Sequence, residues 1–335
     1  MDTVNVNTEN IDPNRTFLPT DVYIETTNYC NAGCFMCPNK NLKRARGFMS
    51  WELFQKIINE LQTIEHSGLD VFLHHFGEPL MDPLLSKRVS YAKAKLKKSI
   101  VTFSTNASLL TYQKSIELIK AGLDEVIFSL DAATKETYSQ MRMCNFDNVV
   151  KNVNDFFKAK KELNGKVLAT CQLIECDKNK HEVKAFREMW TNKCGDNEPR
   201  IVIKPMHNFL TQGTSIMTQK LSEKQLLPCL QPFTYLFIYW NGDVALCCWD
   251  ADHYMKLGNV NDKPILELYN SDEYKRIRKA MLDKTVDFFP CNKCSQIFGK
   301  DMNCWIYQKK LRIKKDDVVK KDDERKTTPN GLEIF

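Results

Sequence analysis

Short apolar runs alternate with amphipathic segments from about residue 19 to residue 205. The amphipathic segments place apolar residues three or four positions apart, which is the period of a helix with one buried face. This alternation is typical of βα units, in which helices cover a parallel sheet. Six strands are predicted, at residues 21–27, 69–75, 99–105, 124–130, 166–174 and 200–205.

Four helices are the clearest segments between these strands. Ser50 is a suitable N-cap for the first, and Thr111 begins the second, which Gly122 ends. Asp147 begins the third, and the fourth covers residues 181–190. Because six βα repeats are fewer than the eight of a closed barrel, the sequence predicts a partial (β/α)6 barrel of the TIM type that stays open.

The pattern changes after Pro205. Two strand-like runs flank Asn241-Gly242, a dipeptide that strongly favours a β-hairpin, and a helix is expected at about residues 264–282. The predicted organisation is an N-terminal arm (1–18), a barrel (19–205), a linker (206–227), a small hairpin-plus-helix module (228–305) and a charged tail (306–335). The tail is either a solvated segment or a docking segment for a partner.

Composition narrows the class of protein. The 48 basic and 42 acidic residues give a formal charge of +6 that is spread along the chain, so we expect no nucleic-acid partner. No apolar run is long enough to span a membrane, and the N-terminal segment lacks the apolar core of a signal peptide. We therefore expect a cytoplasmic protein with no membrane partner.

Three of the thirteen cysteines, Cys30, Cys34 and Cys37, lie directly after the first predicted strand. Cytosolic thiols stay reduced, so metal ligation explains such a group better than disulfides do. A structural zinc site needs four ligands, whereas three thiolates can hold three irons of a cubane cluster and leave the fourth iron open. The spacing therefore indicates an iron–sulfur cluster with one free coordination position.

The pattern Cys-x3-Cys-aromatic-x-Cys, with Phe35 as the aromatic residue, resembles the signature of radical S-adenosylmethionine (radical SAM) enzymes. The resemblance implies a [4Fe-4S] cluster whose open iron binds the amino and carboxylate groups of S-adenosylmethionine. It also implies cleavage of that cofactor to a 5′-deoxyadenosyl radical, which takes a hydrogen atom from a substrate. A reducing partner such as a flavodoxin or ferredoxin would supply the electron.

Further segments are similar to cofactor-binding segments of this family. The turn at residues 74–80 resembles the family's Gly-Gly-Glu-Pro turn, with Phe76 in place of the first glycine, and polar residues end the third and fourth strands. The resemblance assigns cofactor binding to Phe35, Phe76, Gly77, Glu78, Ser104, Asn106, Ser129, Asp131 and Arg142. His74 and His75 are expected to be structural, with at most one of them functional.

A second group of cysteines consists of Cys229, Cys247, Cys291 and Cys294. Four thiolates suit either structural zinc or a fully ligated cluster. Their layout resembles the auxiliary-cluster module called SPASM or its shortened form, twitch, although Cys304 does not keep the spacing of the full form. The resemblance implies one auxiliary [4Fe-4S] cluster.

Cys248 and Asp250 follow the second ligand of this group. Cys248 is a substitute ligand, a buried apolar residue or a donor of a hydrogen atom to a substrate radical. Asp250 is either a base for a substrate hydroxyl or amine or a surface residue at the end of the hairpin. Both are retained as catalytic candidates.

The resemblance favours two-electron oxidation of a small carbohydrate-like or natural-product substrate, with the auxiliary cluster as electron acceptor. The layout is similar to that of the butirosin-pathway dehydrogenase. Three alternatives remain. The first is a peptide-modifying enzyme, although the 20 or so residues before the first strand leave no room for a peptide-recognition domain. The others are an epimerase that uses Cys248 as hydrogen donor and a metal-stabilised binding protein without activity.

Overall fold

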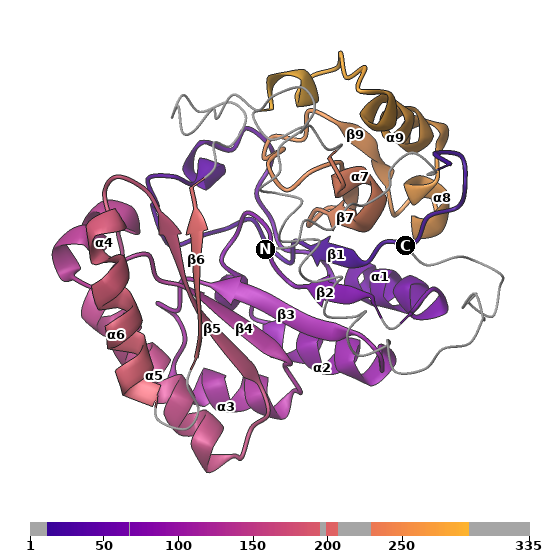
Figure 1. The fold of residues 1–335 in the computed structure, drawn as a ribbon. Helices are drawn as coiled ribbons and strands as arrows, with labels where there is room; N and C mark the ends of the chain where they lie inside the picture. Colours follow the sequence, from indigo (N-terminus) through magenta and orange to yellow (C-terminus); the bar gives the residue numbers. More distant parts are fainter. Residues whose placement is uncertain (1–11, 67, 195–198, 207–228, 295–335) are drawn as a thin grey trace, which may run out of the picture.

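The computed structural model describes residues 12–66, 68–194, 199–206 and 229–294. Nine strands form one continuous sheet in the order β6-β5-β4-β3-β2-β1-β7-β8-β9 (Figure 1). The six predicted parallel strands are β1 (Asp21–Ile24), β2 (Asp70–Phe72), β3 (Ile100–Thr105), β4 (Glu125–Ser129), β5 (Leu168–Glu175) and β6 (Arg200–Pro205). The predicted open partial barrel is confirmed.

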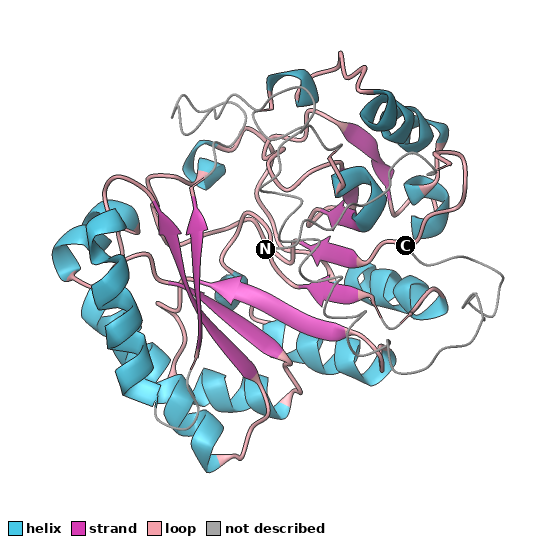
Figure 2. Cartoon of the chain, in the orientation of Figure 1, coloured by secondary structure: helices cyan, strands magenta, loops and turns pink. Residues whose placement is uncertain are grey.

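Helices cover one face of this sheet, as Figure 2 shows. They are α1 (Trp51–Thr63), α2 (Leu85–Lys95), α3 (Tyr112–Lys120), α4 (Lys135–Met141), α5 (Phe146–Glu162) and α6 (Val183–Cys194). Short 3₁₀ turns are η1 (Pro38–Asn41), η2 (Pro79–Met81) and η3 (Lys180–Glu182). Two helices, α2 and α4, were not predicted, because α2 is rich in lysine and α4 has only seven residues.

The predicted caps of two helices are confirmed. The hydroxyl of Ser50 accepts a hydrogen bond from the backbone of the first turn of α1, and Thr111 does the same for α3. The prediction that Asp147 begins the third helix was wrong by one residue. Asn145 is the cap of α5, and Asp147 lies in its first turn, where a negative charge is also favourable.

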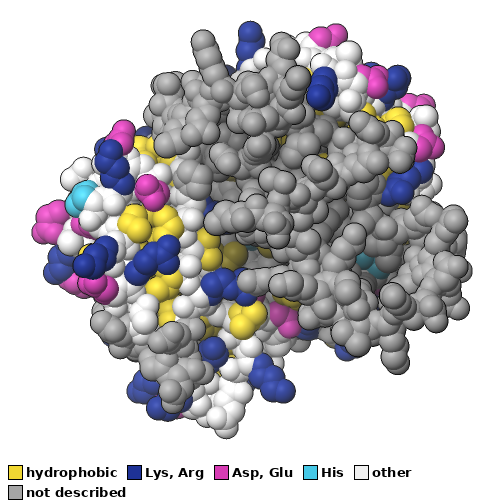
Figure 3. All heavy atoms as spheres, in the orientation of Figure 1, with side chains coloured by type: hydrophobic (Ala, Val, Ile, Leu, Met, Phe, Trp, Pro, Cys, Tyr) yellow, Lys and Arg dark blue, Asp and Glu magenta, His cyan; other side chains and the backbone are white. Residues whose placement is uncertain are grey.

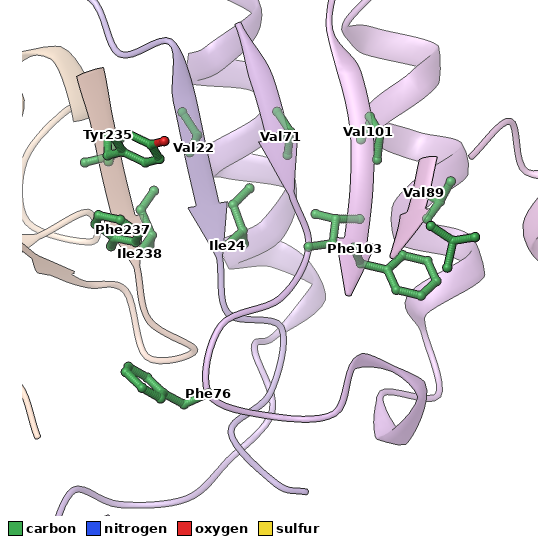
Figure 4. Packing of buried hydrophobic residues seen from close by; sticks show 14 of the residues in the cluster. Val22, Ile24, Val71, Phe76, Val89, Val101, Phe103, Tyr235, Phe237 and Ile238 are labelled. Atoms are coloured by element: carbon green, nitrogen blue, oxygen red, sulfur yellow. The ribbon is translucent and has the colours of Figure 1, made fainter. Parts of the chain in front are cut away.

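The two faces of the sheet have different neighbours. Val22 of β1 pairs in register with Val71 of β2, and Figure 4 shows such residues on the side of the helices, with Phe103 of β3 directed toward Val89 of α2. The alternate residues belong to the opposite face, which we call the inner face. The register places on it Tyr23, Phe72, Thr102, Ser104, Ile127, Ser129, Gln172, Lys204, Tyr235 and Phe237.

The predicted hairpin is confirmed as β7 (Tyr235–Ile238) and β8 (Asp243–Ala245). Gly242 has a φ of 90° at its turn, which is a conformation that glycine adopts without strain. A third strand, β9 (Lys256–Asn259), was not predicted and pairs with β8. The hairpin continues the barrel sheet, because β7 pairs in parallel with β1.

The single helix predicted for residues 264–282 was wrong. The chain forms two helices, α8 (Ile265–Tyr269) and α9 (Asp272–Asp283), because Ser271 caps α9 after a break at Asn270. A short helix, α7 (Gln231–Thr234), precedes β7, and a 3₁₀ turn, η6 (Cys291–Lys293), follows α9.

The last residues of the predicted arm are anchored. Phe17 is buried, its backbone exchanges hydrogen bonds of 2.7 and 3.0 Å with the side chain of Asn270, and its ring packs against Phe233. Residues 1–11, the predicted linker from residue 207 and the predicted tail lie outside the described residues.

The surface carries charges of both signs. On the described part of the face in Figure 3, basic and acidic side chains are interspersed over the helices at the left. Within the described ranges, no helix is both long and apolar enough to cross a membrane.

Candidate active site

The loop after β1 carries Cys30, Cys34 and Cys37. Cys34 is buried, and the other two are partly exposed. The sulfur of Cys30 accepts a hydrogen bond of 3.5 Å from the backbone of Ala32, and that of Cys37 accepts one of 3.5 Å from Asn39. Burial raises the pKa of Cys30 to about 12 and that of Cys37 to about 11, with the neighbouring cysteines adding to both shifts.

These thiols fit an iron site. Ligation to iron requires thiolates, and a positive metal centre offsets the burial that otherwise keeps the thiols protonated. Backbone N–H groups directed at the sulfurs stabilise the same thiolates. The loop is therefore suited to holding a cationic cluster.

The turn from Phe76 to Glu78 packs tightly against this loop. A Cβ atom on Gly77 would lie 2.1 Å from the backbone oxygen of Thr27, so only glycine fits there. The carboxylate of Glu78 is buried and accepts hydrogen bonds from the hydroxyl of Thr105 (2.6 Å) and the backbone of Asn106 (2.8 Å). The side chain of Glu78 thus fixes the turn to the end of β3, and its backbone remains the candidate for cofactor contact.

Phe76 has a buried side chain, and its backbone oxygen accepts a hydrogen bond from Asn39, which follows the cysteine loop. Phe35 is partly exposed, with the ammonium of Lys178 4.7 Å from the centre of its ring. The backbone N–H of Phe35 donates to Met141 at the end of α4. These contacts join the loop to the elements that surround it.

The polar residues at the strand ends have two different environments. The amide of Asn106 donates to Asn31 in the cysteine loop (3.0 Å), and Asn31 in turn donates to the hydroxyl of Ser108 (2.8 Å). The backbone of Ser104 donates to His74 (3.1 Å), and Ser129 is buried on the inner face. Asn31 and Ser108 were missed by sequence reasoning; Ser108 is two residues from Asn106, whereas only the fold brings Asn31 beside it.

Arg142 forms an ion pair with Asp131 and donates a hydrogen bond of 3.5 Å to the sulfur of Cys34. Burial lowers the pKa of Arg142, but the charges of Asp131 and Cys34 more than offset this and raise it above its ordinary value. Burial raises the pKa of Asp131, although Arg142 opposes the shift. A cation paired with Asp131 therefore lies directly beside the cysteine loop, and its contact with a cofactor carboxylate stays a prediction.

The four cysteines of the second group line one cavity, together with apolar residues of α7 and α9. These cysteines are Cys229, Cys247, Cys291 and Cys294. Burial raises the pKa of Cys229, and a hydrogen bond that the thiol of Cys247 donates to Cys248, together with burial, raises the pKa of Cys247. The sulfur of Cys247 accepts a hydrogen bond of 3.4 Å from the backbone of Trp249. The cavity fits a fully ligated cluster in the same way as the first loop fits its own.

No group of three or more His, Cys, Asp or Glu side chains among the described residues is arranged to hold a single metal ion. Four thiols around one cavity match the number of ligands of a fully ligated cluster.

Cys248 is not part of the lining of this cavity, and it packs, partly buried, against the hydrophobic core. The amide of Gln231 donates to its sulfur at 3.7 Å. Cys248 is thus joined to the auxiliary cavity through Gln231, which lines it.

Asp250 does not lie open to a substrate in the described structure. It is 1% exposed, and its two carboxylate oxygens accept hydrogen bonds of 2.8 Å from the backbones of Tyr254 and Met255. The prediction of a surface residue was wrong, and a role as base finds no geometric support, because the carboxylate holds the turn that follows β8.

Lys204 was not singled out by sequence reasoning. The register places it on the inner face at the end of β6. Burial lowers its pKa, while Glu125 and Cys248 oppose the shift, and Lys204 in turn helps to lower the pKa of His74. Only the alternation of side-chain direction along β6 could have identified Lys204 from the sequence.

Behind the cysteine loop lies a buried ion pair between Glu25 and Arg44, with contacts of 2.7 and 2.5 Å. Arg44 also donates to the backbone of Ala251 (2.7 Å) and lies 4.0 Å from the ring centre of Tyr239. His75 is buried beside the pair, and burial lowers its pKa, so its imidazole is neutral. Neither ring nitrogen of His75 has a hydrogen-bond partner among the described residues, so its structural role stays a prediction.

Two family models match the chain. The model of the radical SAM superfamily matches residues 24–174, and that of the SPASM iron–sulfur cluster-binding domain matches residues 229–295. They contain the cysteine loop and the auxiliary cavity, respectively.

Several known proteins are similar to this chain over most of its length. The S-adenosyl-L-methionine-dependent 2-deoxy-scyllo-inosamine dehydrogenase of Niallia circulans is 21% identical over 264 residues, which are 78% of this chain and 86% of the relative. The crystal structure of BtrN in complex with AdoMet and 2-DOIA has a TM-score of 0.55 at 18% identity and covers 84% of this chain and 92% of BtrN. The structure of anSMEcpe with bound AdoMet has a TM-score of 0.62 at 14% identity. The match covers 90% of this chain and 98% of anSMEcpe.

Proposed function

Because the chain belongs to the radical SAM superfamily and carries a SPASM domain, we propose that it oxidises a small carbohydrate-like or natural-product substrate by two electrons. The family requires S-adenosylmethionine and a [4Fe-4S] cluster, and the SPASM domain requires auxiliary iron–sulfur chemistry. When bound, the cofactor and its cluster would remove a hydrogen atom from the substrate, and the auxiliary cluster would accept one electron. The remaining proton must be taken by a group of the protein or by water.

The observation that carries the proposal is the position of Lys204 and Cys248. Lys204 lies on the inner face, Cys248 contacts Gln231 at the lining of the auxiliary cavity, and the two groups of candidate ligands lie in the cysteine loop and around that cavity. A substrate held there would lie between the two proposed clusters. The name of the relative from Niallia circulans also supports oxidation, since that protein is a dehydrogenase of an inosamine.

Lys204 is the proton acceptor in this proposal. Burial lowers the pKa of Lys204, so a neutral amine is more accessible there than at an exposed lysine. The Nζ atom takes the proton of the substrate hydroxyl after the hydrogen atom has left the adjacent carbon. Asp250 has no such role, because both of its oxygens are engaged.

The first experiment reconstitutes the protein with iron and sulfide without oxygen, adds dithionite and S-adenosylmethionine, and measures 5′-deoxyadenosine. We expect formation that is lost in Cys34→Ala, and stimulation by aminocyclitols and related polyols in a substrate panel. The oxidised product would be two mass units lighter than the substrate. Absence of 5′-deoxyadenosine from a protein that contains about eight irons per chain would refute the proposal.

A second candidate function is epimerisation, which the thiol of Cys248 beside the auxiliary cavity favours. The thiol would return a hydrogen atom to the substrate radical, and the product would then have the mass of the substrate. Reaction in D2O separates the two functions, because an epimerase incorporates one solvent deuterium on carbon. Cys248→Ala would abolish epimerisation but leave oxidation, whereas Lys204→Met would slow oxidation.

A further inference from the structure

His74 has a ring nitrogen with no hydrogen-bond partner among the described residues. The backbone N–H of Ser104 donates to its Nδ1 atom at 3.1 Å, so that atom carries no proton. Burial lowers the pKa of His74 to about 3, which keeps the imidazole neutral with its single proton on Nε2. The Nε2–H group is therefore a donor for which the described part of the chain offers no acceptor.

His66 shows how a structural histidine of this chain differs. Its Nδ1 atom also accepts a hydrogen bond from a backbone N–H, that of Gly68, at 3.1 Å. Its Nε2 atom, however, donates to the carbonyl of Pro19 at 3.1 Å. Since buried polar groups are normally hydrogen-bonded, the unused donor of His74 needs an explanation that His66 does not.

The ring of His74 lies on the inner face of the sheet. It packs edge-on against Tyr23 and Phe72 of that face, with ring centres 5.5 and 6.1 Å apart. On the side of the helices (Figure 4), Val22 and Val71 are fully buried, whereas Tyr23 and His74 are partly exposed. Solvent therefore reaches the inner face at His74, and a small ligand has access to the same place.

Aromatic rings form the wall beside this donor. Tyr23 stacks on Phe72 of β2 with ring centres 4.3 Å apart, and Phe237 of β7 lies 5.0 Å from Tyr23 on its other side. An apolar wall with a few fixed polar groups is typical of a small-molecule site. The C–H groups of a ring-shaped polyol can pack on these aromatic rings while one of its oxygens accepts the imidazole N–H.

We propose that His74 is a substrate-binding residue whose Nε2–H donates a hydrogen bond to a hydroxyl or carbonyl oxygen of a polyol held against Tyr23. This inference rests on the proposed function, which gives the enzyme a small carbohydrate-like substrate. An ammonium group cannot replace that oxygen, because it has three donors and no acceptor. His74 therefore selects substrates that carry an oxygen atom at this position.

The test measures binding of scyllo-inositol to the reconstituted protein with S-adenosylmethionine, by isothermal titration calorimetry without a reductant. His74→Asn keeps an acceptor for Ser104 but does not reach the position of Nε2, so binding should weaken about tenfold. His74→Gln should restore most of the affinity, because its longer amide donates near that position. His66→Asn is the matched control and should bind as the unchanged protein does.

Kinetics distinguish this role from a structural one. With dithionite as reductant, His74→Asn should raise about tenfold the concentration of scyllo-inositol that half-saturates its stimulation of 5′-deoxyadenosine formation. The rate at saturation should change less than about twofold, because the hydrogen bond is already present before the hydrogen atom leaves. A structural defect would instead lower the rate at saturation and the iron content.

A further measurement uses the unchanged protein and does not depend on the folding of a variant. Diethyl pyrocarbonate modifies histidine, and mass spectrometry of the peptides gives the rate for each residue. Saturating scyllo-inositol should slow the modification of His74 about threefold or more. The modification of His181, whose side chain is 65% exposed, should not change.

Equal affinities of the unchanged protein and His74→Asn, or no binding of scyllo-inositol at all, would overturn the inference. A loss in His74→Gln as large as in His74→Asn would refute the role of the donor, and so would modification of His74 at the same rate with and without scyllo-inositol. If dithionite produces no 5′-deoxyadenosine, the proposed function fails, whereas the calorimetry and the chemical modification still decide about His74.

Discussion

At the scale of single residues, the candidate active site depends on very close packing between backbone segments. The turn that would face the cofactor approaches the cysteine loop so closely that the position of one glycine is fixed by a carbonyl group of the opposite segment. Around it, buried polar side chains hold the loops in place through short hydrogen bonds. Substitutions here should therefore change the site before they change the fold.

Gly77→Ala should displace the turn, because its Cβ would lie 2.1 Å from the backbone oxygen of Thr27. We expect at least a tenfold loss of dithionite-driven cleavage of S-adenosylmethionine, with iron content retained. Gly68→Ala is the control, since the nearest atom lies at 3.4 Å. Equal loss in both variants would show that the close approach at Gly77 is unimportant.

His74 should make stability depend on pH. Burial lowers its pKa to about 3 in the folded protein, whereas an unfolded histidine titrates near 6.5. The unfolded state therefore binds more protons below pH 6.5, and stability falls as the pH drops from there toward 3, by about 2 kcal/mol at pH 5.

The measurement is urea unfolding at pH 7 and pH 5. His74→Asn keeps an acceptor for the backbone of Ser104 but removes the titrating group. The difference in unfolding free energy between the two pH values should therefore shrink. Parallel losses in the variant and the unchanged protein would contradict the assignment.

Residue spacing predicted that Cys229, Cys247, Cys291 and Cys294 come together, and the structure places them around one cavity, while their role as ligands stays a prediction. It could not predict the environment of Asp250 or Lys204. The environment of Asp250 depends on a turn whose backbone N–H groups donate hydrogen bonds to its carboxylate. The environment of Lys204 depends on the alternation of β6, where the sequence has no motif. Side-chain direction in loops is set by contacts that are distant in sequence.

At the scale of elements, the sequence predicted the six parallel strands and the hairpin but not every boundary. The break between α8 and α9 had a local signal, because Ser271 is followed by Asp272 and Glu273, which is typical of a helix start. This helix start was overlooked, because the apolar residues before and after Ser271 follow a helical period. β9 has only four residues and two exposed positions, so its pattern was too short to identify.

Ser271→Ala should lower the unfolding free energy by about 1 kcal/mol, because the hydroxyl caps α9. The variant can be compared with Ser139→Ala on α4, where the hydroxyl is exposed and bonds only within its own helix. That control should change the free energy by less than about 0.5 kcal/mol. Urea unfolding of the metal-free protein measures both.

At the scale of the whole molecule, buried charges connect the barrel to the C-terminal module. Glu25 follows β1, and Arg44, its partner, also donates to Ala251 and lies over Tyr239. The ion pair therefore joins the barrel, through Glu25, to the C-terminal module, through Ala251 and Tyr239. Its energetic role should appear in the stability of the entire chain.

Arg44→Met should destabilise the protein by about 3–5 kcal/mol, because it leaves the carboxylate of Glu25 buried without its partner. Adding Glu25→Gln to this variant should recover part of the loss. Glu273→Gln breaks the exposed pair with Arg276 and should cost at most about 1 kcal/mol. A loss in Arg44→Met no larger than in Glu273→Gln would contradict this role.

The pairing of β1 with β7 has a consequence for synthesis on the ribosome. The two strands are neighbours in the sheet, yet 214 residues separate them along the chain. Until β7 has emerged, one edge of β1 has no partner strand among those already made, and an open edge can pair with other chains. Folding of the barrel is thus completed late, and a nascent chain halted before β7 is exposed to aggregation through its first strand.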